Sequence, residues 1–209
     1  MKIRTLATAM SSLAALGISL AAAPAHASAE ALMRAKCLPC HTEADDGISR
    51  ISHQRKTPEG WLMSVARMQI IHGLKITDEE RRTVVKHLAD RQGLAPSETA
   101  GVRYAMERRL NTVEAFESEK FTQMCARCHS GARVMLQRRP AEEWEHLVHF
   151  HLGQFPTTEY QALGRDRDWF GIALKEMVPE LASKLPLKSE AWKQWQARSP
   201  QEVKGEWSM

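Results

Sequence analysis

The sequence has almost no net charge and, after its first 27 residues, no apolar run long enough to cross a membrane. Its 29 Lys and Arg against 25 Asp and Glu give a formal charge of +4, which falls to +2 when Lys2 and Arg4 leave with the N-terminal segment. So weak a bias gives no reason to expect nucleic acid as a partner. A membrane-spanning helix needs about 20 apolar residues, so no membrane span is expected after that segment is removed. Strand-like alternation is missing before the extreme C-terminus, which predicts an all-α fold.

The N-terminal segment, residues 1–27, has the features of a signal peptide. A basic start is followed by an apolar stretch over residues 6–23 and by an A-x-A cleavage motif at residues 25–27. A membrane anchor is the alternative, but the apolar stretch is short and rich in small residues. Cleavage would leave a mature chain from Ser28 in the periplasm.

Cysteine is scarce, and its four residues all fall in two copies of one motif, C-x-x-C-H, at residues 37–41 and 125–129. In a c-type haem site the two thiols form thioethers with the haem vinyl groups, and the histidine binds the iron from the proximal side. A redox pair or half of a zinc site are the alternatives. The histidine directly after each pair favours haem over both, and no thiol is left over. The predicted ligands of two covalently bound haem c groups are Cys37, Cys40, His41, Cys125, Cys128 and His129.

Apolar residues at helical spacing predict a series of helices joined by polar loops. The clearest pattern covers residues 58–72, with proline at the first position and an apolar stripe along one face. Thr77 and Glu80 form a capping box that is expected to begin the next helix. Residues 42–57 are expected to form a loop. Further helices are expected before each C-x-x-C-H motif and over residues 97–110, 140–151, 172–181 and 186–196.

The two motifs are followed by similar sequences. Q-R-K-T-P-x-x-W occupies residues 54–61, and Q-R-R-P-x-x-x-W occupies residues 137–144. The match predicts a duplicated cytochrome c-like dihaem domain, in which one helical haem-binding unit is used twice. The first unit would span residues 28–96 and the second residues 97–200. Residues 201–209 would be the start of a truncated following β-domain or a tail.

The repeat also suggests the sixth ligands of the two irons. Aligning Trp61 with Trp144 places Met68 opposite His151, each seven residues further on and on the same face of its helix. A thioether and an imidazole are both normal distal ligands of haem c. The predicted axial pairs are His41 with Met68 for the first haem and His129 with His151 for the second.

Other residues compete for these positions. Methionine at helical spacing is usually core filler, and His72 lies one turn after Met68 on the same stripe. His146 and His149 compete with His151, although both lie off the tryptophan stripe. Methionine ligation favours ferrous iron, whereas bis-imidazole ligation generally lowers the potential. Electrons are therefore expected to pass from the second haem to the first.

Arginines in the loops between proximal and distal ligands are candidates for the haem propionates, because a guanidinium group pairs with a carboxylate in a bidentate fork. Arg55 and Arg138 occupy equivalent positions of the repeat and are the preferred candidates. Arg133 and Arg139 lie in the same loop as Arg138. Ordinary solvated surface charge is the alternative for each of them.

The order of motifs resembles the N-terminal dihaem domain of the quinohaemoprotein amine dehydrogenase α subunit. The resemblance covers residues from about 29 to 200. It rests on C-L-P-C-H, T-P-E-G-W-x-M-x-x-x-R-M, H-G-L, C-A-R-C-H-S-x-A-R, Q-R-R-P, E-E-W, H-F-H-L-G-Q-F-P-T-x-E-Y and R-D-R-D-W-F. In that family the α subunit continues into β-rich domains, whereas this sequence stops at Met209.

The resemblance implies a periplasmic heterotrimer. A quinone-bearing small subunit would oxidise primary amines beside a β-propeller subunit, and the two haems would pass electrons to a cupredoxin or a soluble cytochrome c. This chain has no cysteine left to build the quinone, so no substrate catalysis is expected in it. A free-standing periplasmic dihaem carrier is the alternative function. A dihaem enzyme of the peroxidase type is a third, and it requires an open sixth position on one iron.

Overall fold

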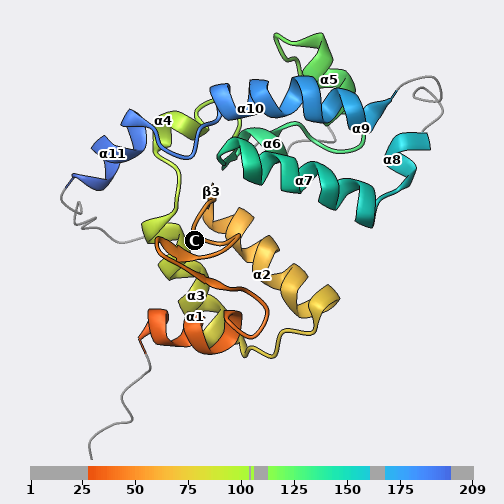
Figure 1. Cartoon of the computed structure of the whole chain (residues 1–209). Coiled ribbons are helices and arrows are strands. Elements are labelled where there is room, and N and C mark those ends of the chain that lie inside the picture. Colours follow the sequence, from red (N-terminus) through yellow and green to blue (C-terminus); the bar gives the residue numbers. More distant parts are fainter. Residues whose placement is uncertain (1–27, 104, 106–112, 161–167, 199–209) are drawn as a thin grey trace, which may run out of the picture.

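The computed structural model describes residues 28–103, 105, 113–160 and 168–198, and it is mainly helical, as the sequence predicts. The predicted signal peptide and the C-terminal residues 201–209 lie outside the described residues. A lower group of helices, α1 to α3, and an upper group, α5 to α10, are stacked on each other (Figure 1). None of the described helices is long and apolar enough to cross a bilayer.

The first unit contains helices α1 (Ala29–Cys37), α2 (Pro58–His72) and α3 (Asp78–Arg91). The side chain of Thr57 caps α2, whose first residue is proline, and Gly73 ends it in the left-handed region at φ 72°. The predicted capping box of α3 is present in full. The buried core of this unit consists of Met33, Ile48, Trp61, Val65, Val84 and Leu88.

The second unit is built from α5 (Glu119–Cys125), α6 (Ala132–Met135), α7 (Ala141–Gln154), α8 (Thr157–Tyr160) and a long C-terminal helix. This long helix comprises three consecutive parts: α9 (Trp169–Ile172), a π-helical turn η1 (Ala173–Met177) and α10 (Val178–Lys184). Such π-helical turns are often found at functional sites. The buried core consists of Phe121, Met124, Val134, Trp144, Val148, Ala173, Met177, Val178 and Leu181.

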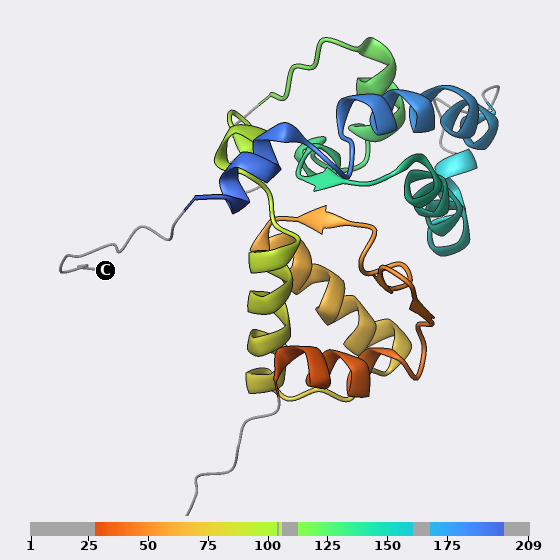
Figure 2. The ribbon, with the colours of Figure 1, turned by 60° about the vertical axis from the view of Figure 1, so that its left-hand side comes forward.

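Four strands of two residues each lie in segments for which the sequence predicted no strand. β1 (Glu43–Ala44) pairs with β2 (Gly47–Ile48) as a hairpin in the segment expected to be a loop. β3 (Arg55–Lys56) pairs with β4 (Gln137–Arg138) and joins the two units. The prediction was wrong here because two residues are too few to show an alternating pattern. Figure 2 shows β3 between the two groups of helices.

The chain crosses between the units twice. After α3 it forms α4 (Pro96–Thr99), and α11 (Glu190–Gln196) at the far end of the described chain packs beside α4 (Figures 1 and 2). The helix expected over residues 97–110 ends early: α4 stops at residue 99, and Gly101 lies in the left-handed region at φ 79°. Residues 104 and 106–112 of that prediction lie outside the described residues. α11 also contacts the first unit, where the side-chain amide of Gln196 donates to the carbonyl of Asp90 at 3.0 Å.

Candidate haem-binding site

Each C-x-x-C-H motif begins at the end of a helix. Cys37 is the last residue of α1, and Cys125 is the last residue of α5. After Cys37 the chain turns tightly, because its carbonyl oxygen accepts hydrogen bonds from the backbone N–H groups of Cys40 at 3.1 Å and His41 at 2.9 Å. A turn of this kind brings two thiols and an imidazole to one side of the chain, as attachment to a single porphyrin requires.

The first cysteine of each motif has a raised pKa. Burial and the neighbouring Cys40 raise the pKa of the Cys37 thiol above its ordinary value. Burial and the carboxylate of Glu180 raise the pKa of Cys125 to about 12. A redox-active cysteine usually has a lowered pKa, because the thiolate is the reactive form. The raised pKa of Cys37 and of Cys125 therefore does not favour the redox alternative.

The histidines predicted as ligands share one hydrogen-bonding arrangement. Nδ1 of His41 lies 3.0 Å from the carbonyl oxygen of Ser49, and Nδ1 of His129 lies 2.9 Å from that of Ser130. Nδ1 of His151 lies 2.8 Å from the carbonyl oxygen of Leu147, one turn earlier on α7. A carbonyl can only accept, so Nδ1 carries the proton and the lone pair of Nε2 is left for a metal.

A cavity of about 470 Å³ lies between the two units and brings the predicted residues of the second site together. Cys125, Cys128, His129 and His151 all line it. The imidazole rings of His129 and His151 have their centroids 6.3 Å apart at an angle of 44°. Two imidazoles on opposite sides of one metal, each with a metal–nitrogen bond of about 2 Å, have centroids roughly 6 Å apart. The pair therefore fits one iron between two rings.

The protonation state of the His151 imidazole is the one that a metal ligand requires. Burial, together with the nearby imidazole of His129, lowers its pKa despite the hydrogen bond to Leu147. The ring is thus neutral, which is the form that binds metal. His146 and His149, the alternatives, do not line the cavity and instead face the carboxylates of Glu143 and Glu145.

The two candidate distal ligands of the first haem differ in exposure. Met68 is half-buried on α2, one turn before His72, which is exposed and is the last residue of the helix. Trp61 and Val65 from the same face of α2 are buried in the core of the first unit, against which Cys37 also packs. His41 and Met68 stay the predicted axial pair of the first haem, with His72 as the alternative to Met68.

The structure gives Arg55 a different partner from the one predicted. All five N–H groups of its guanidinium are used within the protein: two bind the carboxylate of Glu98, and the others bind the carbonyls of Leu187 and Gly93 and the hydroxyl of Ser189. No donor is left for a propionate. Sequence reasoning could not find this partner, because Glu98 lies 43 residues away.

Arg138 is directed to the same carboxylate. Its Nε lies 3.2 Å from Oε1 of Glu98, and its other nitrogens bind the carbonyls of Met135, Gln137 and Glu98. Neither Arg55 nor Arg138 lines the cavity. In this structure both guanidinium groups bind Glu98 and join the two units, and the assignment of Arg55 and Arg138 to haem propionates stays a prediction.

Other basic residues line the cavity instead. Arg133 and Arg139, the alternatives considered from the sequence, are among them, and so are Lys56 and Arg67 from the first unit. The repeat contained a signal for Lys56, since it aligns with Arg139 directly after the duplicated arginines. No local pattern points to Arg67, which reaches the cavity because α2 packs over it with Gly60, Met63 and Ser64 on the same face.

These features define a helical haem-binding domain of the c-type cytochrome class, in which the residues of the second C-x-x-C-H motif and His151 line one cavity. The chain belongs to the haem-binding family of the quinohaemoprotein amine dehydrogenase α subunit. The family model described as "Quinohemoprotein amine dehydrogenase A, alpha subunit, haem binding" matches residues 27–192, which is most of the chain. No curated protein matches it. As a member of this family, the chain is a haem-binding electron-transfer protein that works with other subunits.

Proposed function

We propose that this chain is the dihaem c electron-transfer domain of a periplasmic quinohaemoprotein amine dehydrogenase. It carries two covalent haem c groups and passes electrons from a quinone cofactor on another subunit to a soluble acceptor, a cupredoxin or a cytochrome c. Membership of the family supports the link to amine oxidation. The observation that supports electron transfer most strongly is the approach of His129 and His151, which line one cavity with their ring centroids 6.3 Å apart.

Two protein ligands on one iron favour a carrier over a catalyst. When bound, haem c supplies a one-electron couple whose potential depends on its axial ligands. A peroxidase-type reaction would need an open or displaceable sixth position. His151 is fixed on α7 by its bond to Leu147 and packed between the rings of Phe150, Phe155 and Trp169. These contacts hold the imidazole in place and oppose its displacement.

The order of electron flow follows from the predicted ligands. With His129 and His151, the second haem would have the lower potential, and with His41 and Met68, the first haem would have the higher one. Electrons would then enter at the second unit and leave through the first. The quinone-bearing small subunit would dock near the second unit, beside the β-propeller subunit, and the acceptor would dock near the first.

Co-purification tests the proposed function against a free-standing dihaem carrier. The chain is expressed with its natural signal sequence in a host that matures haem c, and the complex is isolated from the periplasmic fraction. A small subunit that stains for quinone and elutes with the chain, and whose amine substrate reduces both haems, is the expected result. A dihaem chain that elutes alone and is not reduced by any amine in that fraction would support the free-standing carrier.

A further inference from the structure

A buried group of cations lies on the wall of the cavity where the two units meet. Lys56, from β3 of the first unit, is 8% exposed, and Arg139, which follows β4 of the second unit, is 5% exposed. Both side chains line the cavity that also contains the C-x-x-C-H residues Cys125, Cys128 and His129. Two positive charges buried in one wall are costly unless an anion compensates them.

The anions available within the described residues do not balance these charges. The ammonium group of Lys56 donates to the hydroxyl of Ser64 at 2.7 Å and lies 5.1 Å from the centroid of the Trp61 ring, and no described carboxylate lies within ion-pair distance of it. Glu143 approaches Arg139 at 3.4 Å but also pairs with Arg50 at 3.0 Å. One carboxylate is thus divided between two arginines, and Lys56 has none.

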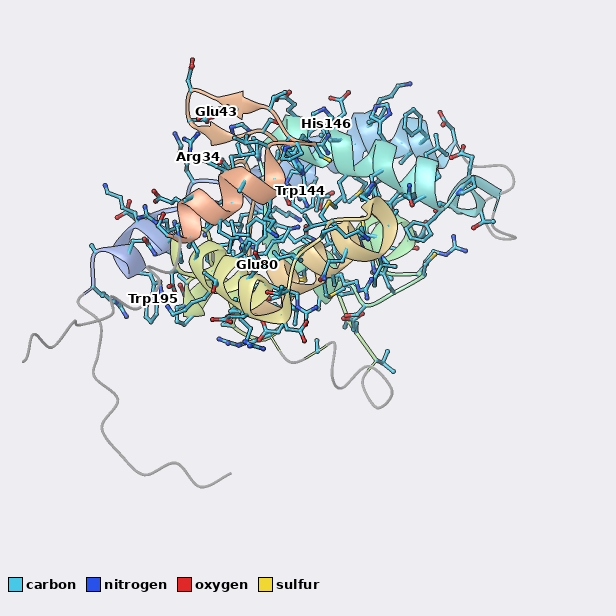
Figure 3. All side chains as sticks on the ribbon, turned by 90° about the horizontal axis from the view of Figure 1, so that it is seen from below. Arg34, Glu43, Glu80, Trp144, His146 and Trp195 are labelled. Atoms are coloured by element: carbon cyan, nitrogen blue, oxygen red, sulfur yellow. The ribbon has the colours of Figure 1, made fainter. Side chains whose placement is uncertain are left out.

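Two further observations indicate that an anion would be stabilised at the same wall of the cavity. Burial, with the charges of Arg139 and Arg67, holds the pKa of Lys56 well below its ordinary value. The indole N–H of Trp144, a side chain that is 1% exposed and lines the cavity, has no hydrogen-bond partner. A buried donor without an acceptor destabilises the fold, because it has lost its bond to water and gained none in return. Figure 3 shows Trp144 inside the molecule, unlike Trp195 at its edge.

An anion that accepts from Trp144 and faces Lys56 and Arg139 would resolve both the charge excess and the unpaired donor. A haem carries two carboxylates, its propionates, on one edge, and Cys125, Cys128 and His129 of the same cavity would hold its vinyl edge and its iron. A carboxylate is a hydrogen-bond acceptor only, as an indole N–H, an ammonium and a guanidinium require.

We propose that a propionate of the second haem is bound by Lys56 of the first unit together with Arg139 and Trp144 of the second. This inference rests on the proposed haem at residues 125–129 and adds to it that the first unit completes the second haem site. The repeat gives the reason: Lys56 and Arg139 are equivalent residues, and the antiparallel pairing of β3 with β4 brings both to one wall. Trp61, the equivalent of Trp144, already donates to the carbonyl of Gln92 at 3.0 Å.

The test is a redox titration at pH 8 of the mature, haem-loaded chain and of its Lys56→Met variant. The number of haems per chain is determined first. The two haems are then distinguished by their absorption spectra, which depend on the sixth ligand of each iron. Removing a buried positive charge disfavours the ferrous state, so the ferrous-to-ferric ratio of the second haem at fixed potential should fall at least about tenfold, which is about 59 mV for a one-electron couple. Lys86→Met, at an exposed lysine, is the matched control.

A second variant keeps the test decisive if Lys56→Met does not fold. Trp144→Phe keeps the ring in the core and removes only the N–H, and it should lower the second potential in the same direction by a smaller amount. Lys56→Arg should restore the wild-type potential. If Lys56→Met and Trp144→Phe both keep two haems and shift the second potential no more than Lys86→Met, the inference is wrong. If the wild-type chain holds no haem at residues 125–129, the proposed function fails as well.

Discussion

Arg55 faces Arg138 across the two-residue ladder formed by β3 and β4. Their guanidinium groups meet on one acceptor, the carboxylate of Glu98, at 2.8 Å and 3.2 Å. The side chain of Glu98 is 6% exposed. Two equivalent arginines of the repeat are thus joined to each other through a residue of the connecting segment, and this buried group links the two haem units.

Glu98→Gln should therefore destabilise the whole chain. Removing one member of a buried ion pair leaves the other charge without compensation, which typically costs about 3–5 kcal/mol. The free energy of unfolding, measured with urea on the haem-loaded protein, should fall by about that amount. Glu190→Gln, on exposed α11, should change it by less than about 0.5 kcal/mol. Equal effects of the two substitutions would show that the arginine pair does not depend on Glu98.

The same carboxylate should give the fold a pH dependence. Although burial alone would raise it, hydrogen bonds from Arg55, the backbone of Ala95 and Ser189 hold the pKa of Glu98 at about 2, below its ordinary 4.5. A group whose pKa is lower in the folded state stabilises the fold above its unfolded pKa. This stabilisation is lost as the pH falls from 4.5 towards 2. The Glu98→Gln variant should lose less stability than the wild type over that range; equal losses would contradict the prediction.

His151→Ala should open the sixth position of the second haem. The absorption and resonance Raman spectra of the oxidised protein should change from six-coordinate low-spin iron to a high-spin form at one haem of the two. His146→Ala and His149→Ala are matched controls on the same helix, and both should keep the wild-type spectra, because these rings face Glu143 and Glu145 outside the cavity. A spectral change in either control and none in His151→Ala would move the ligand to another residue.

Met68→Ala and His72→Ala decide the sixth ligand of the first haem. Loss of a thioether ligand removes its preference for ferrous iron, so Met68→Ala should lower the potential of the first haem and leave the second unchanged. His72→Ala, one turn further along α2, should leave both potentials unchanged. The measurement is a spectroelectrochemical titration of both haems. A selective shift in His72→Ala instead would make His72 the ligand and remove the basis for the proposed direction of electron flow.

The sequence predicted those structural features that depend on residues close together in the chain. The helix over residues 58–72, the capping box of Thr77 and Glu80, and the stripe that carries Trp144 and His151 all follow from spacings of a few residues, which a helix imposes. The spacing from Trp144 also selected His151 over two neighbouring histidines, and this is the imidazole that faces His129.

The contacts between the units could not be read in the same way. Arg55 binds Glu98 and the carbonyl of Leu187, 43 and 132 residues further on, and no local period reports such pairs. The sequence also gave no signal for Arg67 as a cavity residue, because a charged residue on a helix is ordinarily solvated. Its position over the ring of Phe150, at 5.0 Å, depends on how α2 packs against α7.

The count of covalent haems in the mature, exported chain tests the account most directly. Intact mass gives the number of haems attached, and the pyridine haemochrome spectrum shows whether both vinyl groups of each are saturated by thioethers. Two haems per chain, falling to one in Cys125→Ala/Cys128→Ala and to one in Cys37→Ala/Cys40→Ala, is the predicted result. A mature wild-type chain with one haem or none would contradict it.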